Sequence, residues 1–147
     1  GIVADACGCA TGLWQPNEFA GFPLDGRLGA PAWFELYTKD YAASQAFLSS
    51  LFGWEFDVMS DTDDFRYSTV SFEGEPVLGI MDFSADAHAE MPQYWGNYLA
   101  VSSVDDAAEA VVAGGGELLI APMDSAFGRM ASLRDPAGAI LSVIESR

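Results

Sequence analysis

The stretch PAWFELYTKDYAASQAFLSSLFG, residues 31–53, predicts a strand followed at once by a helix. Apolar and polar residues alternate up to Thr38, which is typical of a strand with one buried face. Asp40 is a helix N-cap residue and Gly53 a helix stop, so we expect the helix to cover residues 41–52. Its large apolar residues fall on one face at helical spacing: Phe47, Leu48, Leu51 and Phe52. This face indicates a helix that covers a sheet.

The same order of elements occurs twice along the chain. Three strand-like segments follow the first helix, at 54–59, 65–74 and 75–83. A strand at 94–102 then leads into a helix at 104–113, with Ser103 and Asp106 as its capping box. Three more strands are expected at 117–122, 128–135 and 138–146. A repeat of about sixty residues in two copies predicts two halves of one pseudo-symmetric α+β domain, since either half alone leaves a sheet face uncovered.

The chain begins with a sequence that matches its own end. VADACGCATGLW, residues 3–14, and LRDPAGAILSVI, residues 133–144, are both apolar runs around an Asp and a Gly three residues later. This pattern predicts a hairpin with a tight turn. We expect residues 2–14 to be ordered on a sheet edge, either of their own domain or of a second copy, because an unpaired apolar strand promotes aggregation. Residues 15–30 read as a linker.

Composition excludes several classes of partner. The net charge of −16, from 22 acidic against 6 basic residues, leaves no basic face for nucleic acid or for an anionic membrane. No apolar run is long enough for a membrane helix, and the first residues lack the basic start of a signal peptide, so a cytoplasmic protein is expected. Cys7 and Cys9 are too close for an unstrained disulfide and are expected to pack in the turn.

The repeated halves resemble the glyoxalase/bleomycin-resistance/extradiol dioxygenase group, the vicinal oxygen chelate superfamily. The resemblance covers residues 31–146 and implies two βαβββ modules, 31–83 and 94–146, paired around a cleft. The phrases Phe-Gly-Trp-Glu, Gly-Arg-Met and Asp-Pro-x-Gly-Ala are particularly similar to actinobacterial glyoxalase or hydroxylase proteins with two such domains in tandem. That likeness implies that residues 1–14 resemble the last hairpin of a preceding domain. The expected partner is therefore a preceding homologous domain or a second copy in a homodimer.

Metal-binding members of this superfamily carry His, Glu or Gln at four strand positions. The resemblance places these positions at Trp33, Leu78, Gly96 and Ser142, and none of these residues is a usual ligand. No metal and no other cofactor is therefore expected. A displaced metal site would need Glu35 together with Glu145 or His88.

Glu35 is the candidate catalytic residue. A carboxylate on a cavity-facing strand is unusual unless it is paired or functional. As a general base it would need a raised pKa, which burial could supply; as a structural residue it could pair with Arg66 or Arg129. His88, the only histidine, is expected in a solvated loop between the halves. The residues predicted to bind a ligand are Trp33, Glu35, Tyr37, Leu78, Tyr98, Arg129 and Ser142.

Three functions are compatible with these residues. The first is a metal-free receptor that binds a small apolar or aromatic metabolite in the cleft, lined by aromatic strand residues. The second is a glyoxalase-like or dioxygenase-like enzyme, with displaced metal ligands or with Glu35 as general base. The third is a structural domain that supports a missing first domain. The fold alone does not separate them.

Overall fold

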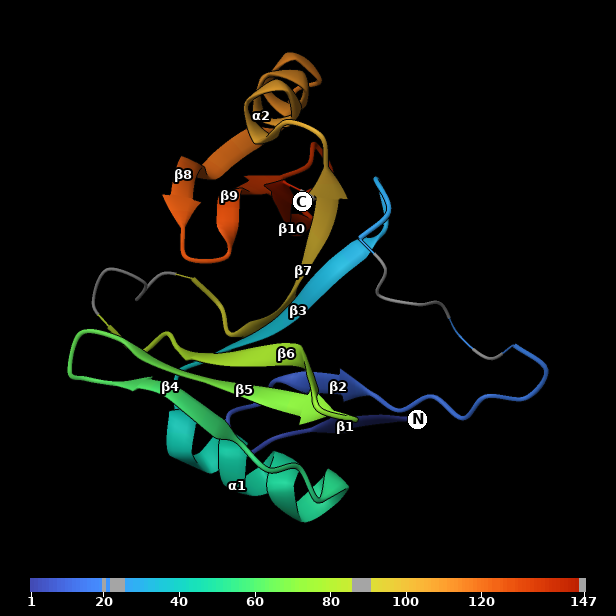
Figure 1. The fold of residues 1–147 in the computed structure, drawn as a ribbon, viewed down its shortest axis with the longest axis vertical. Helices are drawn as coiled ribbons and strands as arrows, with labels where there is room; N and C mark the ends of the chain where they lie inside the picture. The colour runs from blue at the N-terminus through green and yellow to red at the C-terminus, as the bar shows by residue number, and fades with distance from the viewer. Residues whose placement is uncertain (20, 22–25, 86–90, 146–147) are drawn as a thin grey trace. The chain divides into compact units, whose positions relative to one another are not determined.

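The computed structural model describes residues 1–19, 21, 26–85 and 91–145 (Figure 1). It is a mixed α+β fold with two helices among the described residues, as expected. The chain divides into two compact units, Gly1–Phe22 with Phe34–Trp95, and Pro23–Trp33 with Gly96–Arg147. The opening hairpin thus belongs to the first unit. Within the described part of the chain no helix is long and apolar enough to cross a membrane.

The first unit contains most of one βαβββ arrangement. Its elements are β3 (Pro31–Thr38), which belongs to this unit from Phe34 on, α1 (Tyr41–Phe52), β4 (Asp57–Asp61), β5 (Arg66–Phe72) and β6 (Glu75–Asp82). The strand order is β4-β5-β6-β3. Strands β4, β5 and β6 form an antiparallel meander, while β3 pairs in parallel with β6. Parallel strands cannot be joined by a tight turn. Here α1 and strands β4 and β5 form the long connection between β3 and β6.

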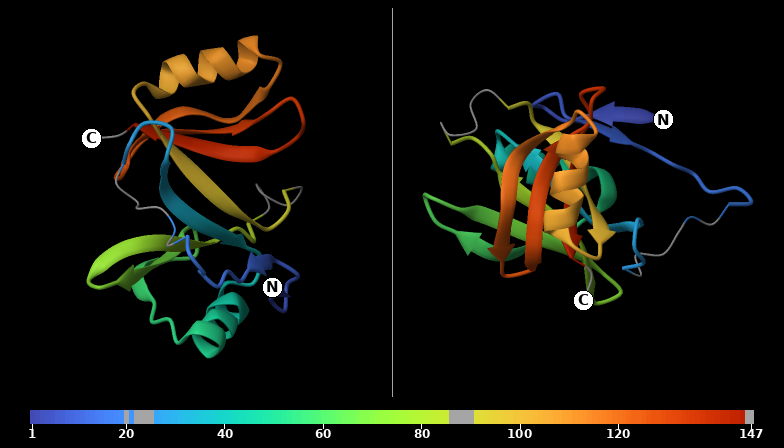
Figure 2. Two further views of the ribbon diagram at one scale, coloured as in Figure 1. Left: turned by 90° about the vertical axis from the view of Figure 1, so that its right-hand side faces the viewer. Right: turned by 90° about the horizontal axis from the view of Figure 1, so that it is seen from above.

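The second unit repeats this arrangement. Its elements are β7 (Tyr94–Val101), which belongs to this unit from Gly96 on, α2 (Val104–Ala113), β8 (Glu117–Ser125), β9 (Gly128–Arg134) and β10 (Ile140–Glu145). The strand order is β7-β10-β9-β8, with β7 parallel to β10. Figure 2 shows α2 lying across one face of these strands. The internal repeat and both helix ranges are confirmed; the strand ends differ from expectation by a few residues.

Each helix packs its apolar residues on one face of its own sheet. In the first unit Leu36, Leu48 and Ile80 form a buried cluster with Phe47 against it. In the second unit Val104 of α2 packs with the buried Leu133. The expectation for α1 was partly wrong, because Leu51 and Phe52 are 41% and 37% exposed. The position turned inward instead is a serine, Ser44, which is fully buried.

The opening hairpin does not pair with a sheet edge of its own chain, which was one of the two predicted arrangements; pairing with a second copy stays a prediction. Strands β1 (Ile2–Ala4) and β2 (Ala10–Gly12) form a separate two-stranded antiparallel sheet. The hairpin packs on the first unit through side chains: Cys9 joins the Leu36 cluster, and Trp95 Nε1 donates to Thr11 Oγ1 over 3.0 Å. Gln93 Nε2 also donates to the Cys7 carbonyl. Within the chain, the hairpin is therefore held by burial of one face and by side-chain hydrogen bonds.

A directed chain of hydrogen bonds fixes the hairpin turn to α1. Ser44 Oγ donates to Asp5 Oδ2 over 2.8 Å, so the Thr38 hydroxyl is the donor in its 2.7 Å contact with Ser44 Oγ. Thr38 Oγ1 in turn accepts from the Asp40 amide at 3.2 Å. The buried carboxylate and both buried hydroxyls thereby find partners, which removes the cost of burying them.

Ser44→Ala tests this link. Removing the hydroxyl leaves Asp5 Oδ2 without its donor, so the free energy of unfolding should fall by about 1–2 kcal/mol. Ser50→Ala is the matched control, because Ser50 is exposed on the same helix. Urea denaturation measures both, and equal stabilities for the two variants would contradict the role of the link.

Candidate functional site

Glu35 lies on the face of the first sheet that α1 does not cover. It is 6% exposed and stands opposite Gly79 of β6, which in turn stands opposite Thr69 of β5. Its neighbour Leu36 points into the cluster under α1. Because side chains alternate along a strand, Glu35 projects from the other face. A buried carboxylate therefore sits in the middle of a face that no helix of its unit covers.

Gly79 makes room for a tyrosine beside Glu35. A Cβ placed on Gly79 would meet the Tyr67 ring, with its Cζ only 2.7 Å away. Tyr67 is itself buried and comes from the neighbouring strand β5. The absence of a side chain at position 79 lets the Tyr67 ring and hydroxyl lie across β6 on the Glu35 face.

Two further aromatic rings extend this face. The Tyr37 ring, two residues along β3 from Glu35, stacks on Tyr94 with centroids 4.8 Å apart and lies 5.0 Å from Phe83. Burial, and secondly the charge of Glu35, raises the pKa of Tyr94 to about 12. The effect of Glu35 on Tyr94 shows that the two side chains share one electrostatic environment.

Two other predicted residues of β3 and β6 take different positions. Trp33 follows the same alternation along β3 as Glu35 and Tyr37, is half-buried, and falls in the second compact unit. Leu78 is paired with Phe34, so it lies on the face that packs against α1, opposite to Glu35. The structure therefore places Leu78 away from the other predicted ligand-binding residues of the first unit.

In the second unit, Tyr98 and Ser142 stand opposite each other on β7 and β10. Both are buried, and Ser142 Oγ is 2.8 Å from Ser132 Oγ of β9. The alternate residue Val143 packs under α2, so Tyr98, Ser132 and Ser142 share the face that α2 does not cover. The structure therefore brings Tyr98 and Ser142, both predicted to bind a ligand, to the same face.

The two arginines proposed to pair with Glu35 bind other carboxylates. Arg129 donates from Nε and Nη2 to Asp105 of α2 at 2.7 and 2.8 Å, and from Nη1 to Asp124 at 3.2 Å. The hydrogen bonds from Arg129 lower the pKa of Asp105. Arg66 lies near Asp61 and Asp82. Arg129 thus joins α2 to β8 on the helix-covered side of its sheet.

The donors do not fit a superfamily metal site. Among the described residues no group of three His, Cys, Asp or Glu side chains gathers as a metal ion requires. Glu145, one proposed substitute ligand, accepts the amide of Val104 at the start of α2. His88 lies outside the described residues. Burial raises the pKa of Cys9 to about 11, so this thiol is protonated at neutral pH and is a poor ligand.

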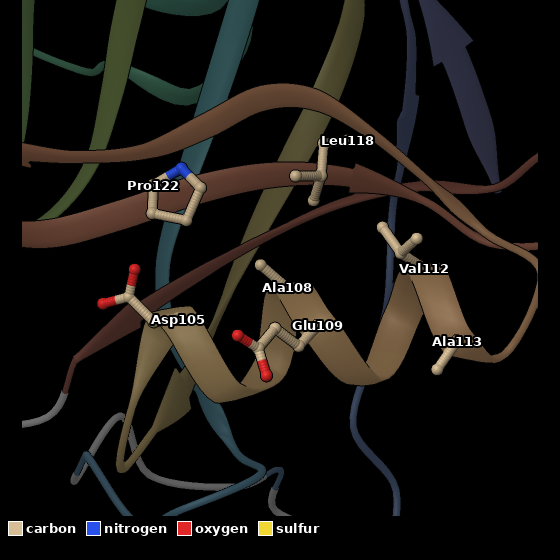
Figure 3. Close-up of a pocket in the computed structure, with 7 residues that line it drawn as sticks. All are labelled: Asp105, Ala108, Glu109, Val112, Ala113, Leu118 and Pro122. Carbon is tan, nitrogen blue, oxygen red and sulfur yellow. The ribbon is translucent and has the colours of Figure 1, made fainter.

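A shallow groove runs between α2 and β8 (Figure 3). Its apolar wall includes Val112 and Leu118, and its acids are Asp105 and Glu109. Asp105 is already bound by Arg129. The groove contains none of the residues predicted to bind a ligand, and we do not assign it a function.

Tyr94 and Gly79 also belong to this face, and neither was predicted as a site residue from the sequence. Tyr94 was expected only as the first residue of a strand, and its stacking on Tyr37 joins residues 57 positions apart. Gly79 carried a usable signal, because an isolated glycine inside a strand pattern indicates a close approach of other atoms.

The comparisons with known proteins agree with the repeated βαβββ architecture. Residues 30–143 match the profile of the Glyoxalase/Bleomycin resistance protein/Dioxygenase superfamily. The chain belongs to this superfamily. It is 38% identical over 127 residues to the anthracycline biosynthesis protein DnrV of Streptomyces peucetius, and 36% identical to DauV of Streptomyces sp. strain C5. Each match covers 78% of this chain and 46% of the relative, so the chain spans about half the length of these relatives.

Solved structures support the fold. Methylmalonyl-CoA epimerase of Streptomyces coelicolor aligns with a TM-score of 0.56 and 16% identity, over 81% of this chain and 98% of that one. A hypothetical protein of Bacillus halodurans aligns with a TM-score of 0.57 and 9% identity, over 78% and 92%. At these identities the likeness concerns the superfamily fold alone.

Titration of Tyr94 tests the shared environment of the Glu35 face. Its raised pKa means that its contribution to stability is complete below pH 10 and is lost as the pH rises toward 12. Tyr94→Phe should therefore lose less stability over this range than the wild type. Glu35→Gln should lower the Tyr94 pKa yet leave it above 10, because burial is the larger cause. Chemical shifts of ¹³Cζ-labelled tyrosine report both, and an unchanged pKa in Glu35→Gln would contradict the coupling.

Proposed function

We propose that this chain is a metal-free, small-molecule-binding domain of the superfamily. The ligand is a flat, apolar or aromatic molecule with one polar edge group. The observation that carries this proposal is the set of side chains on the helix-free face of the first sheet: one buried carboxylate, Glu35, beside the stacked rings of Tyr37 and Tyr94. Aromatic walls with a few placed polar groups are typical of sites for such ligands.

Two kinds of side chain would contact the ligand in this arrangement, aromatic rings and a carboxylate. Stacked tyrosine rings offer large rigid surfaces at little cost in conformational entropy. A buried carboxylate accepts hydrogen bonds from a hydroxyl or amine of the ligand, and such charge-assisted bonds are stronger than neutral ones. In the second unit, the buried Ser132 and Ser142 hydroxyls beside Tyr98 support the same role for that helix-free face.

The names of two relatives support a narrower proposal for the class of ligand. DnrV and DauV are named for anthracycline biosynthesis, and anthracyclines are planar polycyclic molecules. We extend this to a proposal that planar polyketide-like aromatics are the preferred class for the present chain.

Binding of doxorubicin, a fluorescent anthracycline with an amine, tests this function. Quenching of its fluorescence should saturate at one site. Glu35→Gln should weaken binding by about tenfold or more, the value of one charge-assisted hydrogen bond. Glu75→Gln, an exposed carboxylate on β6, removes the same formal charge and should leave the affinity unchanged. Equal weakening by both variants would indicate attraction to the overall negative charge and would contradict a site at Glu35.

Metal content tests the proposal that the domain is metal-free. The protein purified without chelators should contain no stoichiometric transition metal. Trp33, Gly96 and Ser142 supply no strong ligand set, and Gly79, which takes the place expected for Leu78 on the Glu35 face, has no side chain. Elemental analysis that finds about one Zn, Mn, Ni or Fe per chain would contradict this.

One observation favours a second function, proton transfer by a glyoxalase-like enzyme. Glu35 and Tyr94 are a carboxylate and a phenol within electrostatic reach of each other, which suits a base and an acid acting on a carbon beside a carbonyl. Exchange of such a carbon-bound proton in D₂O, lost in Glu35→Gln, would favour this reading over a receptor.

A further inference from the structure

Strand β4 forms an outer edge of the sheet in the first unit, and apolar side chains project from it into solvent. Among the described strands β4 pairs only with β5, so the other edge of β4 has no strand beside it there. Val58 and Met59 of β4 are 65% and 60% exposed, and Phe72 at the end of β5 is 70% exposed. Single exposed apolar residues are common, but several on adjacent strands mark a candidate interaction surface.

Val58 and Phe72 lie on the face of the sheet where α1 packs, beyond the area that the helix covers. Val58 pairs with Ser68 of β5. The Ser68 hydroxyl is hydrogen-bonded to Tyr41 and accepts from Gln45, both on α1. Val58 is therefore on the α1 face, and Phe72 follows Ser68 on that face by alternation along β5. The helix covers the middle of β5 and leaves β4 and the end of β5 open.

The end of α1 continues this apolar surface. Leu51 and Phe52 are its last two residues and are both exposed. The Phe52 ring stacks on Trp54 with centroids 4.8 Å apart, and Ser49 Oγ donates to the Trp54 carbonyl over 2.7 Å. These contacts fix the segment that leads into β4 against the end of the helix. The β4 edge surface comprises Leu51, Phe52, Val58, Met59 and Phe72.

The segment that carries the β4 edge surface is strongly acidic. Residues 54–75 contain seven acids and one base, Arg66. Arg66 donates to Asp61 over 3.0 Å and lies 3.6 Å from Asp82, so its charge is already shared between carboxylates. A partner of this surface therefore meets a negative potential.

Acidic and apolar side chains alternate between the two faces of β4. Asp57 pairs with Thr69, and its Oδ2 accepts from Ser71 Oγ over 3.3 Å. Val58, the next residue, pairs with Ser68 and so projects from the α1 face. Because neighbouring side chains point to opposite faces, Asp57 lies on the face away from α1.

The turn beside Phe72 carries an acid where the backbone favours other residues. Glu73 has a φ of 53° and Gly74 a φ of 87°. A two-residue hairpin turn with two positive φ angles is usually Asn-Gly or Gly-Gly, because other side chains are strained there. Glu73 thus adds negative charge to the end of the surface at a conformational cost.

We propose that the β4 edge surface binds an extended segment of another protein in which apolar and basic residues alternate. The segment adds to the open edge of β4 as a further strand, so that main-chain hydrogen bonds hold it. Its apolar side chains contact Val58 and Phe72 on the α1 face. Its basic side chains lie beside Asp57 on the other face, where opposite charges on neighbouring strands are stabilising.

A second copy of this chain fits the surface less well than a basic segment. Pairing of two β4 strands would bring the acids of both copies together, and like charges across an interface are unfavourable. Met59 also forms a bulge, because Val58 pairs with Ser68 and Ser60 with Tyr67. A bulge in an edge strand opposes pairing between identical edges, whereas a separate extended segment can follow the local twist.

Binding of a synthetic peptide tests the surface. The probe is acetyl-Lys-Val-Lys-Phe-Lys-Val-Lys-amide, and the comparison peptide replaces Val and Phe by Ser at the same charge. On addition of the probe, the amide resonances of residues 57–61 should shift and their hydrogen exchange should slow by about tenfold or more. The serine peptide should bind at least about tenfold more weakly. Equal binding of the two peptides, or unchanged β4 amides, would overturn the proposal.

Two pairs of matched variants locate the site. Val58→Ser should weaken binding of the probe by about tenfold, whereas Val112→Ser, at an exposed valine of α2, should leave it unchanged. Asp57→Asn should weaken binding and reduce its dependence on salt, whereas Glu109→Gln on α2 should change neither. All four side chains are exposed, so the variants should keep the unfolding temperature of the wild type. Equal effects within either pair would indicate attraction to the net charge alone and would overturn the proposal.

Sedimentation of the chain without peptide tests the other occupant. The wild type and Val58→Ser should have the same sedimentation coefficient at every concentration. A dimer that Val58→Ser dissociates would assign the β4 edge surface to a second copy and overturn the proposal.

Discussion

The alternation of side chains along β3 is the constraint on which the candidate site depends. Leu36 is 1% exposed and packs with Leu48 of α1 and Ile80 of β6. A shift of one residue would place Glu35 against Leu48 and expose Leu36, at the cost of both apolar burial and an unpaired charge. Because α1 fixes which residues face inward, Glu35 and Tyr37 are fixed on the opposite face. The core of the first unit therefore orients the side chains proposed to bind the ligand.

On the Glu35 face, the missing side chain of Gly79 leaves room for the Tyr67 ring. With Gly79 opposite Glu35, the Tyr67 ring crosses β6 and narrows the space around the carboxylate. Burial raises the pKa of Tyr94 and the nearby Glu35 charge raises it further, so the phenol stays protonated at neutral pH. A carboxylate and several tyrosine rings thus gather on one face of the sheet. Position 79 is thus as important for the site as the residues that carry functional groups.

Local signals in the sequence were sufficient for the helices but not for every side-chain direction. Asp40 and Ser103 accept the amides expected of N-caps, and both helix ranges were predicted. Leu78 was placed by counting four residues from Gly74, but β6 contains an extra residue between the pairs Val70–Leu78 and Ser71–Pro76, and this irregularity reverses the face. The same count from Gly138 succeeds for Ser142, because the β9–β10 register is regular. Ser44 was missed because its partner Asp5 is 39 residues away.

The opening hairpin shows that one local sequence can satisfy two different environments. The Asp-x-x-Gly turn makes its own hydrogen bonds, so the geometry at Asp5 and Asp135 is the same although their surroundings differ. The surroundings determine only what the other groups of the hairpin contact. Asp5 Oδ2 accepts a hydrogen bond from the Ser44 hydroxyl of α1, and Cys9 packs in the core of the first unit. Exposed Leu13 and Trp14 are the residues that this docking leaves uncovered. A turn that is stable by itself allows the same hairpin geometry to form in two different surroundings.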